Sequence, residues 1–254
     1  MANMYHEANR HGWDANARAG RGQIDQTMHW RECYADATHF FLAEEMIWMA
    51  DVAGKSVGVL GSGDNLAAFA LAGMGARVTS VDISEEQLRI ADERATEVDA
   101  DIRFVRADVT DLAELPDDSF DYVYTGGHVA VWVSDLWAYY REAVRILLPG
   151  GRLLINEYHP FRRSVWLGDD RTFNYFTRGP FTFDQAEEIP GAVPGTLPTY
   201  EFHWTVSDFV TAVQDAGAIL LHLREVGEER ECWESMDLAG LPRCLLLFAQ
   251  KESK

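Results

Sequence analysis

The spacing of hydrophobic positions changes near residue 53 of the chain. Before that point apolar and aromatic residues follow a helical spacing, which predicts a helical segment over residues 1–52. After it, short apolar runs alternate with longer stretches of helical pattern, and such alternation predicts a parallel sheet with helices on both faces. The predicted strands cover 56–60, 77–82, 102–105, 120–124 and 152–156.

The alternation stops over residues 161–204, which are unusually rich in aromatic side chains and prolines. So aromatic a segment is unlike a disordered linker, and we interpret it as an insertion packed over the ligand-binding edge of the sheet. A helix at about 206–216 follows, then strands at 219–225 and 244–249. The pattern therefore predicts a helical cap over 1–52 and an α/β domain over 53–254 that contains the insertion.

Glycines and carboxylates follow three successive predicted strands. The turn GSG at 61–63 lets the backbone approach a ligand without a Cβ in the way. Asp82 ends the second strand, where it can accept hydrogen bonds from ribose hydroxyls. Asp108 follows the third strand, where it can accept from an exocyclic amine while Val109 packs on a purine. Each of these acids alone suits a helix cap, but their places at successive strand ends predict a nucleotide-like site.

These motifs, in this order, resemble the class I S-adenosylmethionine-dependent methyltransferases. The resemblance covers about 55–157 and resumes at WTVSDF, 204–209. It implies an α/β Rossmann-like, doubly wound sheet of seven strands, mostly parallel with the last strand antiparallel. It also implies S-adenosylmethionine as the cofactor and S-adenosylhomocysteine as the product. The matching segments are VGVLGSG (57–63), VDIS (81–84), VRADV (105–109), FDYV (120–123) and RILLPGG (145–151).

The resemblance also implies a role for individual residues. The glycine turn would lie against the methionine part of the cofactor, Asp82 would bind the ribose and Asp108 the adenine amine. Two positions depart from the family pattern: Val59 replaces the usual acid and Asn65 replaces a glycine, although asparagine tolerates left-handed backbone angles. The implied cofactor-binding residues are Gly61, Ser62, Gly63, Asn65, Asp82, Ile83, Asp108, Val109, Thr125 and Gly126.

Methyl transfer from a sulfonium is an in-line displacement, so most of the work of such a protein is positioning. A general base is needed where the nucleophile must lose a proton. His128 and His159 follow the fourth and fifth strands and are the candidate catalytic residues, although each can instead be structural. The aromatic residues near this edge predict a closed pocket for a planar or hydrophobic acceptor with an N, O or C nucleophile. The predicted substrate pocket contains Trp13, Trp132, Tyr158 and Trp204.

The composition of the chain limits the kinds of substrate and partner that we expect. The formal net charge of −19 repels phosphate backbones, which argues for a small-molecule substrate and against nucleic acid. Neither a long apolar run nor a signal-peptide pattern is visible, and the three cysteines are widely spaced, so we expect a cytoplasmic protein, with a homodimer left open. Metal-dependent methyltransferases of the catechol type hold the metal with acidic ligands at strand ends. Residues 126–127, after the fourth predicted strand, are both glycines and offer no such ligand, so we predict no metal.

Two other functions fit parts of the pattern. A dehydrogenase that uses NAD(P) also has a glycine turn after the first strand, but its third small residue would fall at Leu66, where leucine is unfavourable. A partner subunit that binds the cofactor without catalysis would share every cofactor motif.

Overall fold

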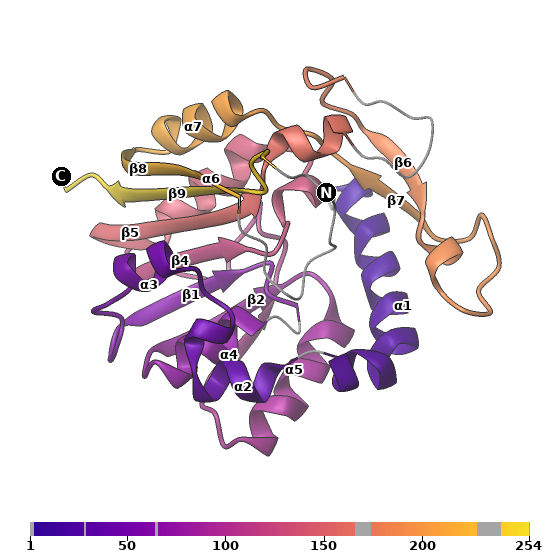
Figure 1. The fold of residues 1–254 in the computed structure, drawn as a ribbon, viewed down its shortest axis with the longest axis horizontal. Coiled ribbons are helices and arrows are strands. Elements are labelled where there is room, and N and C mark those ends of the chain that lie inside the picture. The colour runs from indigo at the N-terminus through magenta and orange to yellow at the C-terminus, as the bar shows by residue number, and fades with distance from the viewer. Residues whose placement is uncertain (1–2, 28, 64–65, 166–173, 228–239, 254) are drawn as a thin grey trace.

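The computed structural model describes residues 3–27, 29–63, 66–165, 174–227 and 240–253. Its centre is a seven-stranded sheet with the strand order β3-β2-β1-β4-β5-β9-β8 (Figure 1). The strands from β1 to β5 pair in parallel, whereas β9 is antiparallel to both β5 and β8. The predicted doubly wound sheet with an antiparallel last strand is therefore confirmed. The strands are β1 (Ser56–Leu60), β2 (Arg77–Asp82), β3 (Ile102–Arg106), β4 (Phe120–Gly126), β5 (Leu147–Tyr158), β8 (Ala218–Val226) and β9 (Cys244–Lys251).

Helices cover both faces of the sheet, because the central strands are apolar on both sides. On one face Leu60 and Leu153 pack with Tyr139 and Phe209, which come from α6 (Leu136–Arg145) and α7 (Val206–Asp215). On the other face the alternate strand positions pack with α4 (Leu66–Gly73) and with the short helices α2 (Trp30–Ala35) and α3 (Ala43–Trp48). The helix α5 (Glu85–Glu97) packs beside β2 and β3.

The N-terminal helix α1 (Met4–Thr27) contacts α5 and the insertion strand β7 (Pro198–Glu201). The insertion forms a two-stranded sheet of β6 (Phe181–Asp184) and β7, with η4 (Gln185–Glu188) between them. Figure 1 shows α1 running beside this small sheet. The approach is close at Gly12, where a Cβ would lie 2.6 Å from Cγ2 of Thr199. Among the described residues, no helix has the length and apolar content needed to cross a membrane.

The start of α5 carries the pattern SxxQ at 84–87, which is typical of a capping box. The Ser84 hydroxyl caps the helix by accepting the Gln87 backbone N–H at 3.2 Å, as the SxxQ pattern indicates. The second half of the capping box is not formed, because the Gln87 side chain does not return to the Ser84 backbone but lies toward the cavity described next.

Candidate active site

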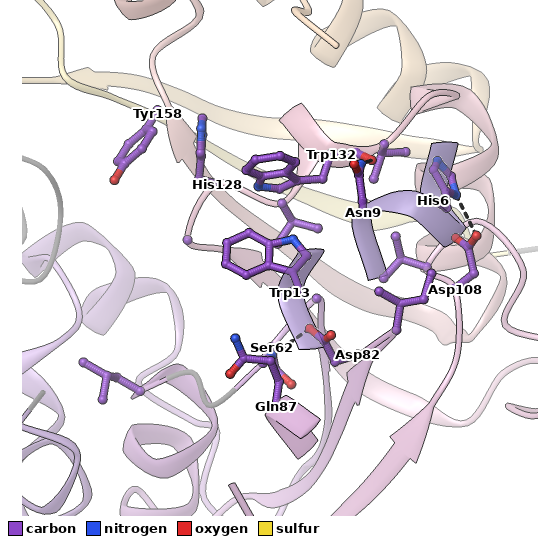
Figure 2. A pocket seen from close by; sticks show the side chains of 18 of the residues that line it. His6, Asn9, Trp13, Ser62, Asp82, Gln87, Asp108, His128, Trp132 and Tyr158 are labelled. Carbon is purple, nitrogen blue, oxygen red and sulfur yellow. Dashed lines mark hydrogen bonds and ion pairs between the residues drawn. The ribbon is translucent and has the colours of Figure 1, made fainter. Parts of the chain in front are cut away.

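A cavity of about 400 Å³ lies at the C-terminal ends of β1, β2 and β4 (Figure 2). Parallel strands bring these ends to one edge of the sheet, which is where α/β proteins of this architecture bind ligands. The predicted site residues that line it are Gly61, Ser62, Gly63, Asp82, Ile83, Asp108, Val109, His128, Trp13, Trp132 and Tyr158.

Five predicted residues are not among those that line the cavity. Thr125 and Gly126 are buried in β4, and a Cβ on Gly126 would lie 2.5 Å from the Tyr124 hydroxyl, so this glycine makes room for a tyrosine. The indole N–H of Trp204 donates to the Ala130 carbonyl at 3.0 Å. His159 pairs with Glu225, and Asn65 lies outside the described residues.

The glycine turn adopts a left-handed backbone at both glycines, with φ of +65° at Gly61 and +53° at Gly63. A Cβ on Gly61 would lie 2.5 Å from Val129, which belongs to the loop after β4. The Ser62 backbone N–H donates to the Val81 carbonyl at 2.9 Å, and its hydroxyl bonds to that of Ser80. The turn is therefore fixed against both neighbouring strands, and its glycines are needed for backbone geometry and close packing.

Asp82 is held in place from two sides. Its Oδ2 accepts the Gly63 backbone N–H at 2.8 Å, and its Oδ1 accepts the Ser84 backbone N–H at 2.8 Å. These bonds link the glycine turn after β1 to the start of α5. Because a carboxylate oxygen can accept more than one hydrogen bond, Asp82 keeps capacity for a ligand hydroxyl.

Asp108, just after the end of β3, is also held by several hydrogen bonds. Its Oδ1 accepts from the Thr110 backbone N–H at 2.9 Å and from the Thr110 hydroxyl at 2.8 Å. Its Oδ2 lies 2.6 Å from Nδ1 of His6. Burial alone would raise the pKa of Asp108, but the bonds from His6 and Thr110 outweigh it, and the pKa falls below its ordinary value. Asp108 is therefore ionised at neutral pH.

His6 was not predicted as a site residue. Its Nε2 accepts the Ser134 backbone N–H at 2.9 Å, so its proton sits on Nδ1 and points to Asp108. His6 is 4% exposed and lines the cavity. The sequence carried no signal for this contact, because the ring comes from α1 and its partners lie far along the chain.

Two more polar residues of α1 tie the helix to the rim of the cavity. The Asn9 amide donates to the Trp132 carbonyl at 3.1 Å and to the Tyr200 carbonyl at 2.9 Å, and accepts the Tyr200 N–H at 2.7 Å. Asp14 accepts the Ser84 hydroxyl at 2.6 Å. Both side chains are buried, so α1 covers the cavity through polar anchors on three different elements.

The other end of the cavity is aromatic. The rings of Trp13 and Trp132 meet edge to face, with centroids 5.2 Å apart, and the rings of His128 and Tyr158 lie 4.2 Å apart (Figure 2). His128 has a φ of +75°, a strained backbone angle for a non-glycine residue. On Tyr158, the guanidinium of Arg162 stacks 4.1 Å from the ring centroid. This end of the cavity is therefore largely apolar, and His128 contributes an imidazole to it.

His159 has a different environment from His128. Its Nε2 lies 2.8 Å from Oε1 of Glu225, and its Nδ1 accepts the Phe161 backbone N–H at 3.2 Å. Burial lowers the pKa of His159 despite the opposing effect of Glu225. These contacts join the end of β5 to β8. Both histidines are predicted to lie beside the cavity, but only His128 lines it.

The described ranges hold no group of three or more histidine, cysteine, aspartate or glutamate side chains suited to a metal ion.

Residues 58–155 match the methyltransferase domain family. Among curated proteins, the chain is 37% identical over 110 residues to a demethylmenaquinone methyltransferase of Clavibacter sepedonicus (43% of this chain and 44% of the relative). It is 40% identical over 83 residues to the 27-O-demethylrifamycin SV methyltransferase of Amycolatopsis mediterranei (32% and 30%). A ubiquinone/menaquinone biosynthesis C-methyltransferase of Nitrobacter hamburgensis is 29% identical over 189 residues (73% and 67%). The chain thus spans less than half the length of the first two relatives.

Solved structures share the fold. An S-adenosylmethionine-dependent methyltransferase from Mesorhizobium loti superposes with a TM-score of 0.63 at 24% identity, covering 84% of this chain and 100% of that one. One from Listeria monocytogenes gives a TM-score of 0.65 at 19% identity, covering 83% and 97%. At these identities the likeness establishes the architecture.

Proposed function

We propose, from the premise that the chain belongs to the class I S-adenosylmethionine-dependent methyltransferase family, that it transfers a methyl group from S-adenosylmethionine to a small molecule. The observation that carries this proposal is the pair of oriented carboxylates, Asp82 and Asp108, in one cavity beside the glycine turn. The curated relatives methylate quinone precursors or a rifamycin by their names, which supports a small acceptor.

The residues present suit the cofactor. Gly61, Ser62 and Gly63 would hold its methionine part, and Asp82 would accept from its ribose. Asp108, ionised and fixed by Thr110, would accept from the adenine amine, with Ile83 and Val109 against the ring. When bound, S-adenosylmethionine supplies a methyl carbon on a positively charged sulfur.

The aromatic end of the cavity would bind the acceptor. Trp13 and Trp132 offer flat apolar surfaces from two separate elements, which suits a planar or hydrophobic molecule. His128 is a titratable side chain at this end, and its neutral imidazole would take a proton from an acceptor hydroxyl or amine. The α1 cover would exclude water and so order the acceptor against the methyl carbon.

The test is calorimetric titration of the full chain with S-adenosylmethionine, S-adenosylhomocysteine and NAD. We expect one site for the first two and none for NAD. Asp82→Asn should weaken cofactor binding by about 1–3 kcal/mol, because the charge that accepts from the ribose is lost. The matched control is Asp118→Asn, since Asp118 pairs with Lys251 outside the cavity. Binding of NAD in place of the cofactor would refute the proposal and favour the dehydrogenase.

Turnover separates an enzyme from a partner subunit that binds the cofactor. Radiolabelled S-adenosylmethionine should transfer its methyl group to members of a panel of phenols, quinols and aromatic amines, each added with the full chain alone. Tight cofactor binding with no transfer to the panel or to small molecules of a cell extract would identify a partner subunit.

A further inference from the structure

The loop between β4 and α6 contains a short turn, η2 (Ala130–Trp132), and contributes to both ends of the cavity. His128 and Trp132 belong to its aromatic end (Figure 2). Val129 lies against Gly61 of the glycine turn, at the end proposed to hold the cofactor. The loop is therefore placed where an acceptor and the cofactor would meet.

Ala130 is held through both of its backbone polar groups by side chains of distant elements. Its N–H donates to Oε1 of Glu157 at 3.0 Å, and its carbonyl accepts the indole N–H of Trp204 at 3.0 Å. Glu157 is buried near the end of β5, and Trp204 ends the insertion, two residues before α7. Because buried backbone groups need hydrogen-bond partners, these two side chains determine where the turn can lie.

The end of the insertion also bonds to the next residue of the turn. The Phe202 backbone N–H donates to the Val131 carbonyl at 2.7 Å. In the described part of the chain, neither Phe202 nor Trp204 lines the cavity, whereas Trp132 does. The insertion therefore holds this loop from outside the cavity.

The indole of Trp204 packs against that of Trp137, a residue of α6, with ring centroids 6.1 Å apart and an edge-to-face arrangement. The two N–H groups have different partners: that of Trp204 bonds to Ala130, and that of Trp137 donates to Oδ2 of Asp215 in α7 at 3.0 Å. Two rings in mutual contact thus differ in whether they bond to the loop.

We propose that Trp204 is a positioning residue for methyl transfer, which acts through Ala130 together with Glu157. By fixing Ala130, the two side chains set where His128 and Trp132 stand at the acceptor end. The inference rests on the proposed function, which supplies the cofactor and the acceptor. An in-line displacement depends steeply on the position of the nucleophile, so a small movement of this loop slows the transfer. The carboxylates proposed to bind the cofactor follow β2 and β3 and do not depend on this contact.

The experiment compares Trp204→Phe with the matched control Trp137→Phe in the full chain. Phenylalanine keeps an aromatic ring at each position and removes the N–H donor. Calorimetric titration with S-adenosylhomocysteine counts the chains that bind the cofactor, and the rate of methyl transfer is expressed per binding chain. The acceptor is the phenol, quinol or aromatic amine of the panel that the wild type methylates fastest. A rate expressed in this way does not depend on how much of a variant is folded.

We expect Trp204→Phe to lower kcat/KM for the acceptor about tenfold per binding chain, with the affinity for S-adenosylhomocysteine unchanged. Trp137→Phe should match the wild type in both measurements. Hydrogen exchange of the backbone amides of 130–132, followed by NMR, should be faster in Trp204→Phe alone, because the turn loses one of its two side-chain anchors.

Glu157 provides a second comparison. Glu157→Gln keeps an oxygen that can accept the Ala130 N–H, whereas Glu157→Leu has none. The rate per binding chain should therefore be higher in Glu157→Gln than in Glu157→Leu.

Two outcomes would overturn the inference. One is a Trp204→Phe variant that transfers the methyl group as fast per binding chain as the wild type. The other is an equal loss in Trp137→Phe, which would assign the effect to packing between the two rings. If the wild type binds the cofactor and methylates no acceptor, the proposed function fails, and unchanged exchange at 130–132 in Trp204→Phe would separately overturn the positioning.

Discussion

His6 and Asp108 are separated by 102 positions in the sequence, yet Nδ1 of the first lies 2.6 Å from Oδ2 of the second. The bond connects the beginning of α1 to the end of β3, at the part of the cavity proposed to hold adenine. The carboxylate that would receive the cofactor amine is therefore oriented by a residue of the covering helix.

The first prediction concerns this bond. His6→Ala should lower the free energy of unfolding at neutral pH by about 1–3 kcal/mol, because it removes a hydrogen bond to a charged, partly buried group. Since the folded-state pKa of Asp108 lies below its ordinary value, the stabilisation exists above the unfolded pKa and is lost as the pH falls through the folded one.

Urea unfolding at neutral pH and at about pH 2–3 tests this, because the latter lies below the ordinary aspartate pKa. The difference in the free energy of unfolding between the wild type and His6→Ala should be smaller at the acidic pH. His11→Ala is the control from the same helix, since His11 is exposed. A difference in the free energy of unfolding that does not change with pH would show that His6 stabilises the fold by packing.

A second prediction concerns α1 as a cover over the cavity. S-adenosylhomocysteine should slow hydrogen exchange in residues 4–27 and in 181–201, while β1 to β5 change little. Asn9→Ala should speed exchange in α1 without ligand, because it removes the bonds to Trp132 and Tyr200. If α1 exchanges as slowly as the sheet in the absence of ligand, it is a fixed part of the core.

The third prediction concerns His128. His128→Asn should lower kcat by about 100-fold for acceptors that must lose a proton, and the value of KM should change little. Asparagine tolerates the left-handed backbone found here, so the loop should keep its shape. The control is His222→Asn, because His222 stacks on Phe248 away from the cavity. Equal kcat values for the wild type and His128→Asn would remove His128 from the chemistry.

The fourth prediction separates backbone strain from steric overlap at the glycine turn. Gly61→Ala places a Cβ 2.5 Å from Val129 at a φ of +65°, whereas Gly191→Ala meets nothing within 4 Å at a φ of +84°. The Gly191 variant should cost about 1 kcal/mol of stability from strain alone, and the Gly61 variant more. Adding Val129→Ala to Gly61→Ala should recover part of the difference. No recovery in thermal unfolding would show that Val129 is not the obstacle.

The alternation of strands and helices, and the glycine and aspartate positions at strand ends, were sufficient to predict the sheet and most of the cavity floor. The side of the cavity that α1 covers could not be predicted in the same way. His6 and Asn9 lie on a long polar helix whose pattern is that of a solvated face, and their partners are set by the tertiary fold.

Family resemblance also has limits at single positions. The resemblance assigns Gly126 to cofactor binding but gives no sign that a Cβ there would lie 2.5 Å from the Tyr124 hydroxyl, which donates to Glu45 at 2.9 Å. Gln87 stands where the SxxQ pattern would place the second half of a capping box, but its side chain lies on the cavity wall. In both cases the motif is local, and the contacts of the residue depend on the neighbouring structure.

The contact between Asn9 and Tyr200 has a consequence for how the molecule behaves toward its own copies. β7 pairs with β6 along one side, and on the other side Asn9 takes both the N–H and the carbonyl of Tyr200. The amide thus makes the bonds that a further strand would make. An unprotected strand edge is a template on which another chain can add itself. Asn9 covers the middle of this edge, and just beyond it the Val131 carbonyl accepts the Phe202 backbone N–H at 2.7 Å. A change that frees α1 would therefore open the cavity and at the same time expose β7 at Tyr200 to self-association.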